Sequence, residues 1–268
     1  MYTNEERVFN WSRKEFLAQA AKEHTAAMEQ NYGAEINTSK MQTRQYSSVS
    51  ENRKREVKNP NVCVQDCDSI AAVECYAAGY KSPAEPYGKT AVLNFASYKK
   101  PGGMFLNGSQ AQEEALCHGS NLYNVLKNFS DYYAWNQAHL NRALYQNRAL
   151  YTPDILFFKD GGIYRCDVIT CAAPNASAAV KCGVHREEIS TVLSSRIRFI
   201  LGIAEEEQVD TLILGAWGCG VFGLDPDEVA SQFRECLGSG QYGFTNVVFA
   251  VPQSDNNQNL QAFCRVFA

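Results

Sequence analysis

The sequence predicts an α/β fold whose central sheet is covered by helices on both faces. From residue 61 onward, short apolar runs of strand length alternate with segments whose apolar residues return every three or four positions. Strands that are apolar throughout are typical of sheets buried on both faces. With 268 residues, 45% of them hydrophobic, the chain can bury a large core. The strand-like runs are NVCV (61–64), KTAVLNFAS (89–97), DILFFKD (154–160), RCDVIT (165–170), VDTLILGA (209–216) and TNVVFAV (245–251).

The first sixty residues differ from the rest in their pattern of apolar and polar residues. Residues 5–31 have helical periodicity, and Gly33 is a suitable stop. Residues 33–60 are polar and end in a charged run, which predicts a solvated connector rather than a nucleic-acid-binding arm. We therefore expect a helical extension and connector at 1–60 and the main domain at 61–268, together forming one compact unit. A further helix is predicted at 187–207.

Composition excludes several classes of protein. The net charge of −4 and the pI of about 5.7 leave no electrostatic footprint for duplex nucleic acid. The sequence has no run of 18 apolar residues and no apolar segment at its charged amino terminus, so we expect no membrane span, no secretory signal and a cytoplasmic monomer. Ten cysteines in that setting should be mostly buried thiols, and their spacing does not indicate zinc. No metal or other cofactor is expected.

A first glycine-rich loop follows the run AVLNFAS. Pro101, Gly102 and Gly103 interrupt the chain, and Gly108 adds a second flexible point. The spacing of Ser109 and Gln112 predicts a capping box and a helix from about Gln110. Its buried face would comprise Ala111, Ala115, Leu122, Tyr123 and Leu126, and its opening turns would hold Gln112, Glu113 and Glu114.

Paired glutamates at a helix start have a plain explanation and a functional one. Carboxylates there suit the helix dipole, by about 0.3–1 kcal/mol each. The glycine-rich loop just before them favours the functional reading, because it lets a ligand approach the backbone closely.

A second glycine-rich loop lies within VDTLILGAWGCGVFGLDPDEVASQF, residues 209–233. Asp225 should cap the following helix, with Pro226 at its first position and Glu228 completing the box. A strand, a glycine loop and a helix start together predict a diphosphate cradle of free backbone N–H groups. The spacing GxGxxG at 218–223 is a weak signal for a dinucleotide, because no acidic residue ends the next strand. Phe222, between glycines, either fills the loop against the core or stacks on a sugar.

With both loops in view, the chain resembles the bacterial-type poly(ADP-ribose) glycohydrolases, whose signature is three glycines, six to eight residues, and Gln-Glu-Glu. Here it reads Gly102-Gly103-Met104, seven residues, then Gln112-Glu113-Glu114. The segments LNFAS, FLNGSQAQEE, VITCAAPN and GAWGCGVFG follow in the family's order. The resemblance implies a macrodomain-like three-layer fold, with a mixed central sheet flanked by helices and an amino-terminal helical extension.

The resemblance also implies a pocket for ADP-ribose, or for poly(ADP-ribose) on modified proteins. Glu114 would be the catalytic acid, Glu113 would bond hydroxyls of the distal ribose, and Gln112 would orient the pair. Phe222 would shape the ribose so that its glycosidic bond is presented, and the loop at 218–223 would hold the diphosphate. The implied substrate-binding residues are Asn94, Gly102, Gly103, Met104, Gln112, Gly218, Gly220, Val221, Phe222 and Gly223.

One position departs from the signature, because Met104 replaces its third glycine. If that position requires a positive φ or close contact with the ligand, methionine should impair binding or turnover. If the loop needs only its N–H groups, the side chain can point outward without harm.

The residues themselves indicate how such a bond would be cleaved. Ordinary glycosidases place two carboxylates on opposite sides of the bond. Adjacent residues on a helix diverge by about 100°, so one acting carboxylate with a positioning neighbour fits better. Glu114, held partly protonated by burial and by its neighbour's charge, would donate a proton to the leaving ribose and then activate water.

Two alternatives share the ADP-ribose pocket. One is a non-catalytic ADP-ribose reader that lost activity through Met104. The other is a hydrolase of ADP-ribose attached to protein, nucleic acid or acetate. The sequence does not separate them, since they differ only in the leaving group. For adenine the candidates are Asp66, Asp68 and Asn175.

Overall fold

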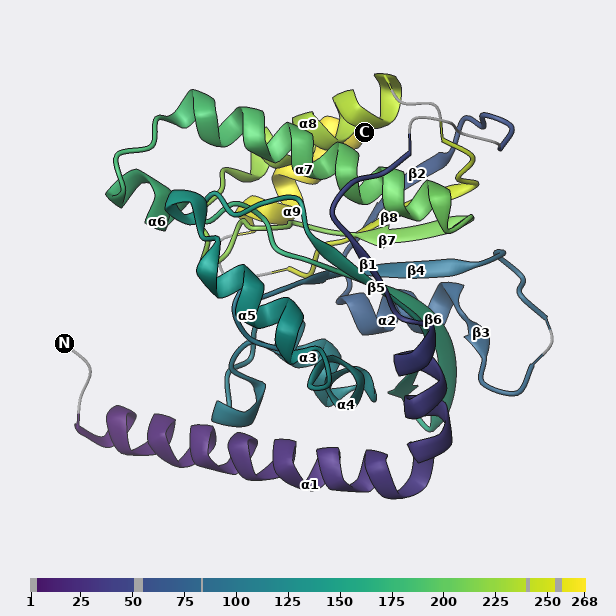
Figure 1. The fold of residues 1–268 in the computed structure, drawn as a ribbon, viewed down its shortest axis with the longest axis vertical. Coiled ribbons are helices and arrows are strands. Elements are labelled where there is room, and N and C mark those ends of the chain that lie inside the picture. Colours follow the sequence, from purple (N-terminus) through teal and green to yellow (C-terminus); the bar gives the residue numbers. More distant parts are fainter. Residues whose placement is uncertain (1–3, 51–54, 83, 240–241, 254–256) are drawn as a thin grey trace.

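The structure, a computed structural model, describes residues 4–50, 55–82, 84–239, 242–253 and 257–268, with side chains from residue 13 onward. A mixed central sheet is flanked by helices on both faces (Figure 1), as expected. The strands are β1 (Arg44–Tyr46), β2 (Asn61–Gln65), β3 (Ala78–Gly79), β4 (Thr90–Phe95), β5 (Ala149–Lys159), β6 (Gly162–Cys171), β7 (Thr211–Leu214) and β8 (Asn246–Ala250).

The sheet has the strand order β1-β5-β6-β4-β7-β8-β2, with β3 paired to β6. From β6 to β2 the neighbouring strands are parallel, and β1, β5 and β3 add antiparallel pairs. The carboxyl ends of five strands therefore meet at one edge. In sheets of this kind ligands bind beyond that edge.

Two apolar cores lie on opposite faces of the sheet. One packs under α6, α7, α8 and α9, and the other under α1, α2, α3, α4 and α5. The helices are α1 (Asn4–Gln42), α2 (Ser69–Tyr76), α3 (Gln112–His118), α4 (Leu122–Leu126), α5 (Ser130–Ala138), α6 (Ala176–Lys181), α7 (Arg186–Glu206), α8 (Pro226–Ser239) and α9 (Gln258–Phe267), with short 3₁₀ turns at Phe105–Asn107 and Asn141–Ala143.

The amino-terminal helix is longer than predicted, and Gly33 does not end it. Helix α1 bends at Tyr32, where φ is −134° and ψ is 29°, and then continues to Gln42. The continuation buries Ile36 and Ser39, which are 4% and 0% exposed. Tertiary packing therefore carries the helix past a residue that local propensity identifies as a stop.

Part of the predicted connector is a strand, which corrects the expectation for 33–60. Residues 44–46 form β1 at the sheet edge, and Arg44 donates two hydrogen bonds to Glu207, at 2.7 and 2.8 Å. Arg55, from the charged run, forms an ion pair with Asp210. Residues 51–54 of that run lie outside the described residues. The described connector thus packs on the sheet domain.

Two findings bear on the exclusions made from composition. Across the described ranges, no helix combines the length and the apolar character that crossing a membrane requires. The ten cysteines are free thiols, of which four are buried, three half-buried and three exposed. The expectation that most would be buried was too strong, because Cys75, Cys182 and Cys264 lie on the outer faces or ends of their helices.

Candidate active site

A cavity of about 1050 Å³ opens at the carboxyl edge of the parallel strands. The chain segments that follow β2, β4, β6, β7 and β8 all contribute to its walls. Both glycine-rich loops line it, although more than 100 residues separate them in the sequence. Of the predicted site residues, those in its wall are Gly103, Met104, Gln112, Glu113, Glu114, Gly218, Gly220, Val221 and Phe222.

The first loop requires its two glycines. Gly102 and Gly103 have φ of 63° and 57°, values that side chains disfavour. A β-carbon at Gly103 would lie 2.6 Å from Oε1 of Glu114 and 2.9 Å from Oε2 of Glu113. The missing side chain therefore makes room for both carboxyl groups at one point of the cavity wall.

The helix that carries the glutamates starts at Gln112, so the prediction of Ser109 as its cap was wrong. Ala111 occupies the cap position, and its N–H donates to Oε2 of Glu114 at 3.1 Å. Oε1 of the same carboxyl accepts from the N–H of Met104 at 2.8 Å. Two backbone N–H groups thus fix the carboxyl of Glu114. This carboxyl accepts from the N–H at the cap position, where Ala111 has no polar side chain.

The expected single helix is two helices. Helix α3 ends at His118, and a break at Gly119–Asn121 separates it from α4. Ala111 and Ala115, expected on the buried face, are exposed in the cavity. Their small side chains leave space beside the glutamates. The apolar residues at helical spacing in this segment therefore line the cavity in part, and are not all in the core.

Glu113 is buried and 3% exposed. Its Oε2 accepts from the N–H of Ser97 at 2.7 Å, and its Oε1 accepts from Nδ2 of Asn94 at 3.2 Å. Burial raises the pKa of Glu113 to about 8, against the lowering effect of these hydrogen bonds, and the negative charge of Glu114 adds to the rise. Near neutral pH this carboxyl accordingly retains a proton.

Gln112 and Asn94 support the pair from behind. The Gln112 side chain accepts from the N–H of Phe95 at 2.8 Å and donates to the carbonyl of Leu93 at 2.9 Å, which ties α3 to β4. Asn94 is 0% exposed, and it contacts Glu113 without being part of the cavity wall. Its predicted contact with the distal ribose stays a prediction.

Met104 adopts φ of −113° and ψ of 28°. No left-handed conformation is needed there, so a side chain costs the loop nothing in backbone strain. The side chain is 39% exposed at the cavity wall, while the N–H serves Glu114. Of the two readings of this position, the geometry favours the harmless one.

The second loop presents unpaired backbone donors to the cavity. Within the described residues, the N–H groups of Gly218, Gly220, Val221 and Phe222 have no hydrogen-bond acceptor. Gly218 and Gly223 have positive φ, and a β-carbon on Gly223 would lie 2.2 Å from Oγ of Ser177. Such a row of free N–H groups is a preformed site for an anion.

The helix after this loop begins with the predicted cap, but the Glu228 side chain accepts from Nε2 of Gln232 at 3.2 Å instead of completing the predicted capping box. Oδ1 of Asp225 accepts from the N–H groups of Asp227 and Glu228, at 2.9 and 3.2 Å, and Pro226 is the first helical residue. The cap fixes the carboxyl end of the loop and hence the direction of its donors.

Phe222 packs against a neighbouring ring, as the first reading expects, while its stacking on a sugar stays a prediction. Its ring is half-buried and packs against Tyr145, with ring centroids 6.2 Å apart, yet it also lines the cavity. Tyr145 and its partner Tyr98 were not identified from the sequence. They lie in segments without a motif, and only their aromatic character hinted at a role.

The adenine candidates are dispersed. Asp68 caps α2 and lines the cavity, whereas Asp66 accepts from the N–H of Gln253 at 2.8 Å. Asn175 caps α6 and is not part of the wall. The structure therefore brings only Asp68 into the cavity. The described residues include no cluster of three or more His, Cys, Asp or Glu side chains suited to a metal ion.

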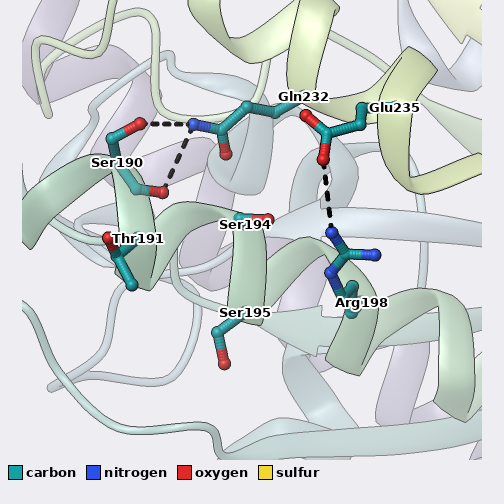
Figure 2. A pocket seen from close by; sticks show the side chains of 7 residues that line it. All are labelled: Ser190, Thr191, Ser194, Ser195, Arg198, Gln232 and Glu235. Atoms are coloured by element: carbon teal, nitrogen blue, oxygen red, sulfur yellow. Dashed lines mark hydrogen bonds and ion pairs between the residues drawn. The ribbon is translucent and has the colours of Figure 1, made fainter. Parts of the chain in front are cut away.

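A second hollow, of about 530 Å³, lies between α7 and α8 (Figure 2). Nε2 of Gln232 donates to the carbonyl and the hydroxyl of Ser190, and Arg198 pairs with Glu235 at 3.5 Å. Its polar groups mainly form hydrogen bonds and an ion pair with each other between the two helices. The lining residues include neither a carboxyl pair nor a glycine loop. The hollow is a packing groove rather than a reaction site.

Comparison with known proteins shows which family the chain belongs to. A family model described as the microbial-type PARG catalytic domain matches residues 12–160, PARG denoting poly(ADP-ribose) glycohydrolase. The poly(ADP-ribose) glycohydrolase of Deinococcus radiodurans, solved with ADP-ribose, is 33% identical, with 86% of this chain and 96% of that chain covered and a TM-score of 0.74.

The poly(ADP-ribose) glycohydrolase of Thermomonospora curvata, solved with the inhibitor ADP-HPD, is 29% identical, with 94% and 99% covered and a TM-score of 0.79. No curated protein sequence matches the chain. The family match spans more than half of the 268 residues, and the relatives are covered almost entirely. The chain belongs to the microbial-type poly(ADP-ribose) glycohydrolase family.

Proposed function

We propose that this chain hydrolyses the ribose–ribose O-glycosidic bond of poly(ADP-ribose) and releases ADP-ribose. One observation carries the proposal: the carboxyl pair Glu113–Glu114 and the free N–H groups of the second loop line the same cavity. Family membership, and the ligands bound to the relatives, support the same substrate.

The lining of the cavity assigns a place to each part of ADP-ribose: the diphosphate, the distal ribose and the adenine. The diphosphate accepts hydrogen bonds from the N–H groups of Gly218, Gly220, Val221 and Phe222, since these have no acceptor among the described residues and belong to residues that line the cavity. The distal ribose then lies between Phe222 and the glutamates, with Glu113 bonding its hydroxyls. The adenine extends toward Asp68 and the chain that follows β8.

Glu114 acts as the general acid and then as the general base. It donates its proton to the bridging oxygen as the bond from that oxygen to the anomeric carbon breaks, which leaves an oxocarbenium-like centre and a free hydroxyl. A water molecule adds to the anomeric carbon, and Glu114 takes the water's proton. One water is consumed and the carboxyl returns to its starting form.

The surroundings explain why one carboxyl is enough. The N–H groups of Met104 and Ala111 hold Glu114 in place, so its orientation costs nothing at the moment of reaction. Because the pKa of Glu113 is raised, the pair retains one proton near neutral pH, and this proton must pass to Glu114 before the bond breaks. The diphosphate supplies negative charge near the oxocarbenium-like centre.

A feature of the cavity rim favours polymer over a single ADP-ribose on protein or acetate. Lys99 and Lys100 line the cavity, and among the described residues neither forms an ion pair. They stand on the glutamate side, because the carbonyl of Lys100 accepts from the N–H of Gly103 at 3.2 Å. The next unit of a polymer carries a diphosphate that this charge would attract.

The test uses Glu114→Gln, which keeps the shape of the side chain but cannot donate a proton. Release of ADP-ribose from polymer should fall by at least about 100-fold, while calorimetry gives an ADP-ribose affinity close to the parent's. Undiminished release would refute the role of Glu114. A parent protein that binds ADP-ribose but releases none from polymer would indicate the non-catalytic reader, and cleavage of only protein-linked ADP-ribose would indicate the other alternative.

A further inference from the structure

Tyr145 lies between the two halves of the site. Its ring stacks on that of Tyr98, with centroids 4.2 Å apart and planes at 14°, and it meets Phe222 on the other side at 6.2 Å. Tyr98 and Tyr145 are 2% and 6% exposed. The three rings form an aromatic ladder, here defined as Tyr98, Tyr145 and Phe222.

Each end of the ladder is next to a part of the site. Tyr98 follows Ser97, whose N–H donates to Glu113. Phe222 belongs to the loop with the free N–H groups and lines the cavity. The ladder therefore connects the segment that bonds Glu113 to the loop with the free N–H groups.

The backbone that places Tyr145 is strained. Four residues in five are left-handed: Asn141, Arg142, Ala143 and Tyr145 have φ of 45°, 52°, 67° and 61°. A left-handed conformation is uncommon for any side chain other than Asn or Asp, and consecutive examples are rarer still. Strain of this kind persists where the surroundings overdetermine it, and it concentrates at functional sites.

The strained turn is held on several sides. Arg196, 1% exposed, donates to the carbonyls of Leu144 and Ala172. The carbonyl of Ala143 accepts from the N–H of Asn175 at 2.9 Å. These contacts join the turn to the end of β6 and to α6, so Tyr145 rests on the rigid part of the domain.

We propose that Tyr145 is a positioning residue of the glycosidic reaction, which sets Phe222 and the segment at Ser97 at the separation that the distal ribose requires. The inference rests on the proposed function. It gives the strained turn a role, since Tyr145 is itself one of the left-handed residues and contacts both neighbouring rings.

The experiment compares Tyr145→Leu, Tyr145→Phe and Tyr242→Leu. Tyr242 is the matched control, because it is 4% exposed and stacks on Phe244 at 5.1 Å, in the segment before β8, at the opposite end of that strand from the cavity. For each variant, kcat and KM on polymer, ADP-ribose affinity by calorimetry and Tm are measured.

Tyr145→Leu should lower kcat by about 10- to 100-fold, with KM and ADP-ribose affinity within about threefold of the parent's. Tyr145→Phe keeps the ring and should restore kcat to within about threefold. Tyr242→Leu should lower Tm but leave kcat nearly unchanged at a temperature where it is folded. A parent without activity would contradict the proposed function instead, so the two failures are distinguishable.

If Tyr145→Leu does not fold, Tyr145→Met and a double-mutant cycle with Phe222→Leu replace it. Because the two rings act as one unit, Phe222→Leu in the Tyr145→Met background should lower kcat much less than it does in the parent. Additive losses, or a folded Tyr145 variant with kcat within about twofold of the parent's, would overturn the inference.

Discussion

At the scale of single residues, Gly103 and Met104 show how adjacent positions of one signature differ in what they require. Gly103 has a positive φ, and both carboxyls lie within 3 Å of the place where a β-carbon would stand. Met104 has a negative φ and contributes only its N–H to Glu114. The concern that the methionine would strain the loop came from treating three signature positions as equivalent.

Gly103→Ala and Met104→Gly therefore form a matched pair. The first should lower polymer cleavage by more than about 100-fold, since a β-carbon would displace both carboxyls. The second should leave kcat within about threefold. Steady-state kinetics with ADP-ribose calorimetry measures both. A large gain in kcat for Met104→Gly would show that the methionine does obstruct the ligand.

Glu113 links the site to stability. Its pKa is raised in the folded protein, so the folded state keeps a proton that the unfolded state releases. Stability should then fall as pH rises from about 4.5 to about 8. Glu113→Gln removes this titration, and it should raise the free energy of unfolding at pH 9 by at least about 2 kcal/mol, with little gain at pH 4.5.

Urea denaturation across that pH range checks the prediction. Glu23→Gln, which replaces an exposed carboxyl, serves as the control and should not change the pH dependence. A gain for Glu113→Gln that is equal at pH 4.5 and pH 9 would contradict the account of a buried, proton-holding carboxyl.

At the scale of elements, the sequence located strands well and helix ends poorly. Each of the six strand-like runs contains a strand, because clustered apolar residues in a run of that length are buried when the sheet forms. Strand β1 was missed because RQY has no apolar pattern, and its position is set by pairing with β5. The start of α3 was misplaced because its cap position is held by Ala111, a residue type that does not indicate a cap. The N–H of Ala111 is bonded by the side chain of Glu114 instead.

The amino-terminal helix, predicted as part of an extension at residues 1–60, lies close to the site. Helix α1 passes so near the end of the first glycine loop that a β-carbon at Gly108 would lie 2.1 Å from the carbonyl oxygen of Lys14. The helix thus supports the loop that holds Glu114. Residues 1–60 and 61–268 were predicted to form one compact unit, and this contact favours it.

Gly108→Ala should push α1 away from the loop and lower the free energy of unfolding by about 2 kcal/mol or more. Gly161→Ala is the control, because Gly161 has φ of 81° and open space around it. The control isolates the backbone strain, of about 1 kcal/mol. The free energy of unfolding is measured by urea denaturation. Equal losses in the two variants would mean that α1 moves away from residue 108 without further loss of stability.

At the scale of the whole molecule, the family resemblance implied that the two glycine loops share one pocket, and both loops line one cavity. The strained turn at 141–145 was beyond sequence reasoning. Its left-handed residues include Arg142 and Tyr145, types that local propensity does not place there, and the contacts that hold it come from α6 and α7.

The charge at the cavity rim predicts a dependence on salt. Replacing Lys99 and Lys100 by alanine should lower kcat/KM on polymer by about 3- to 10-fold at low ionic strength, and by less at 0.5 M salt. ADP-ribose affinity should change by less than about twofold. Alanine at Lys159 and Lys181, which do not line the cavity, gives the same change in net charge. Equal effects of the two pairs would assign the result to overall charge.

The central claim is that both glycine loops enclose one nucleotide sugar, with Glu114 at its anomeric bond. A crystal structure of Glu114→Gln with ADP-ribose tests it most directly. We expect the diphosphate on the N–H groups of Gly218, Gly220, Val221 and Phe222. The residue-114 side chain should lie within about 2.6–3.2 Å of the oxygen on the anomeric carbon, directly or through one water. ADP-ribose bound elsewhere, or with its distal ribose turned away from that side chain, would contradict the account.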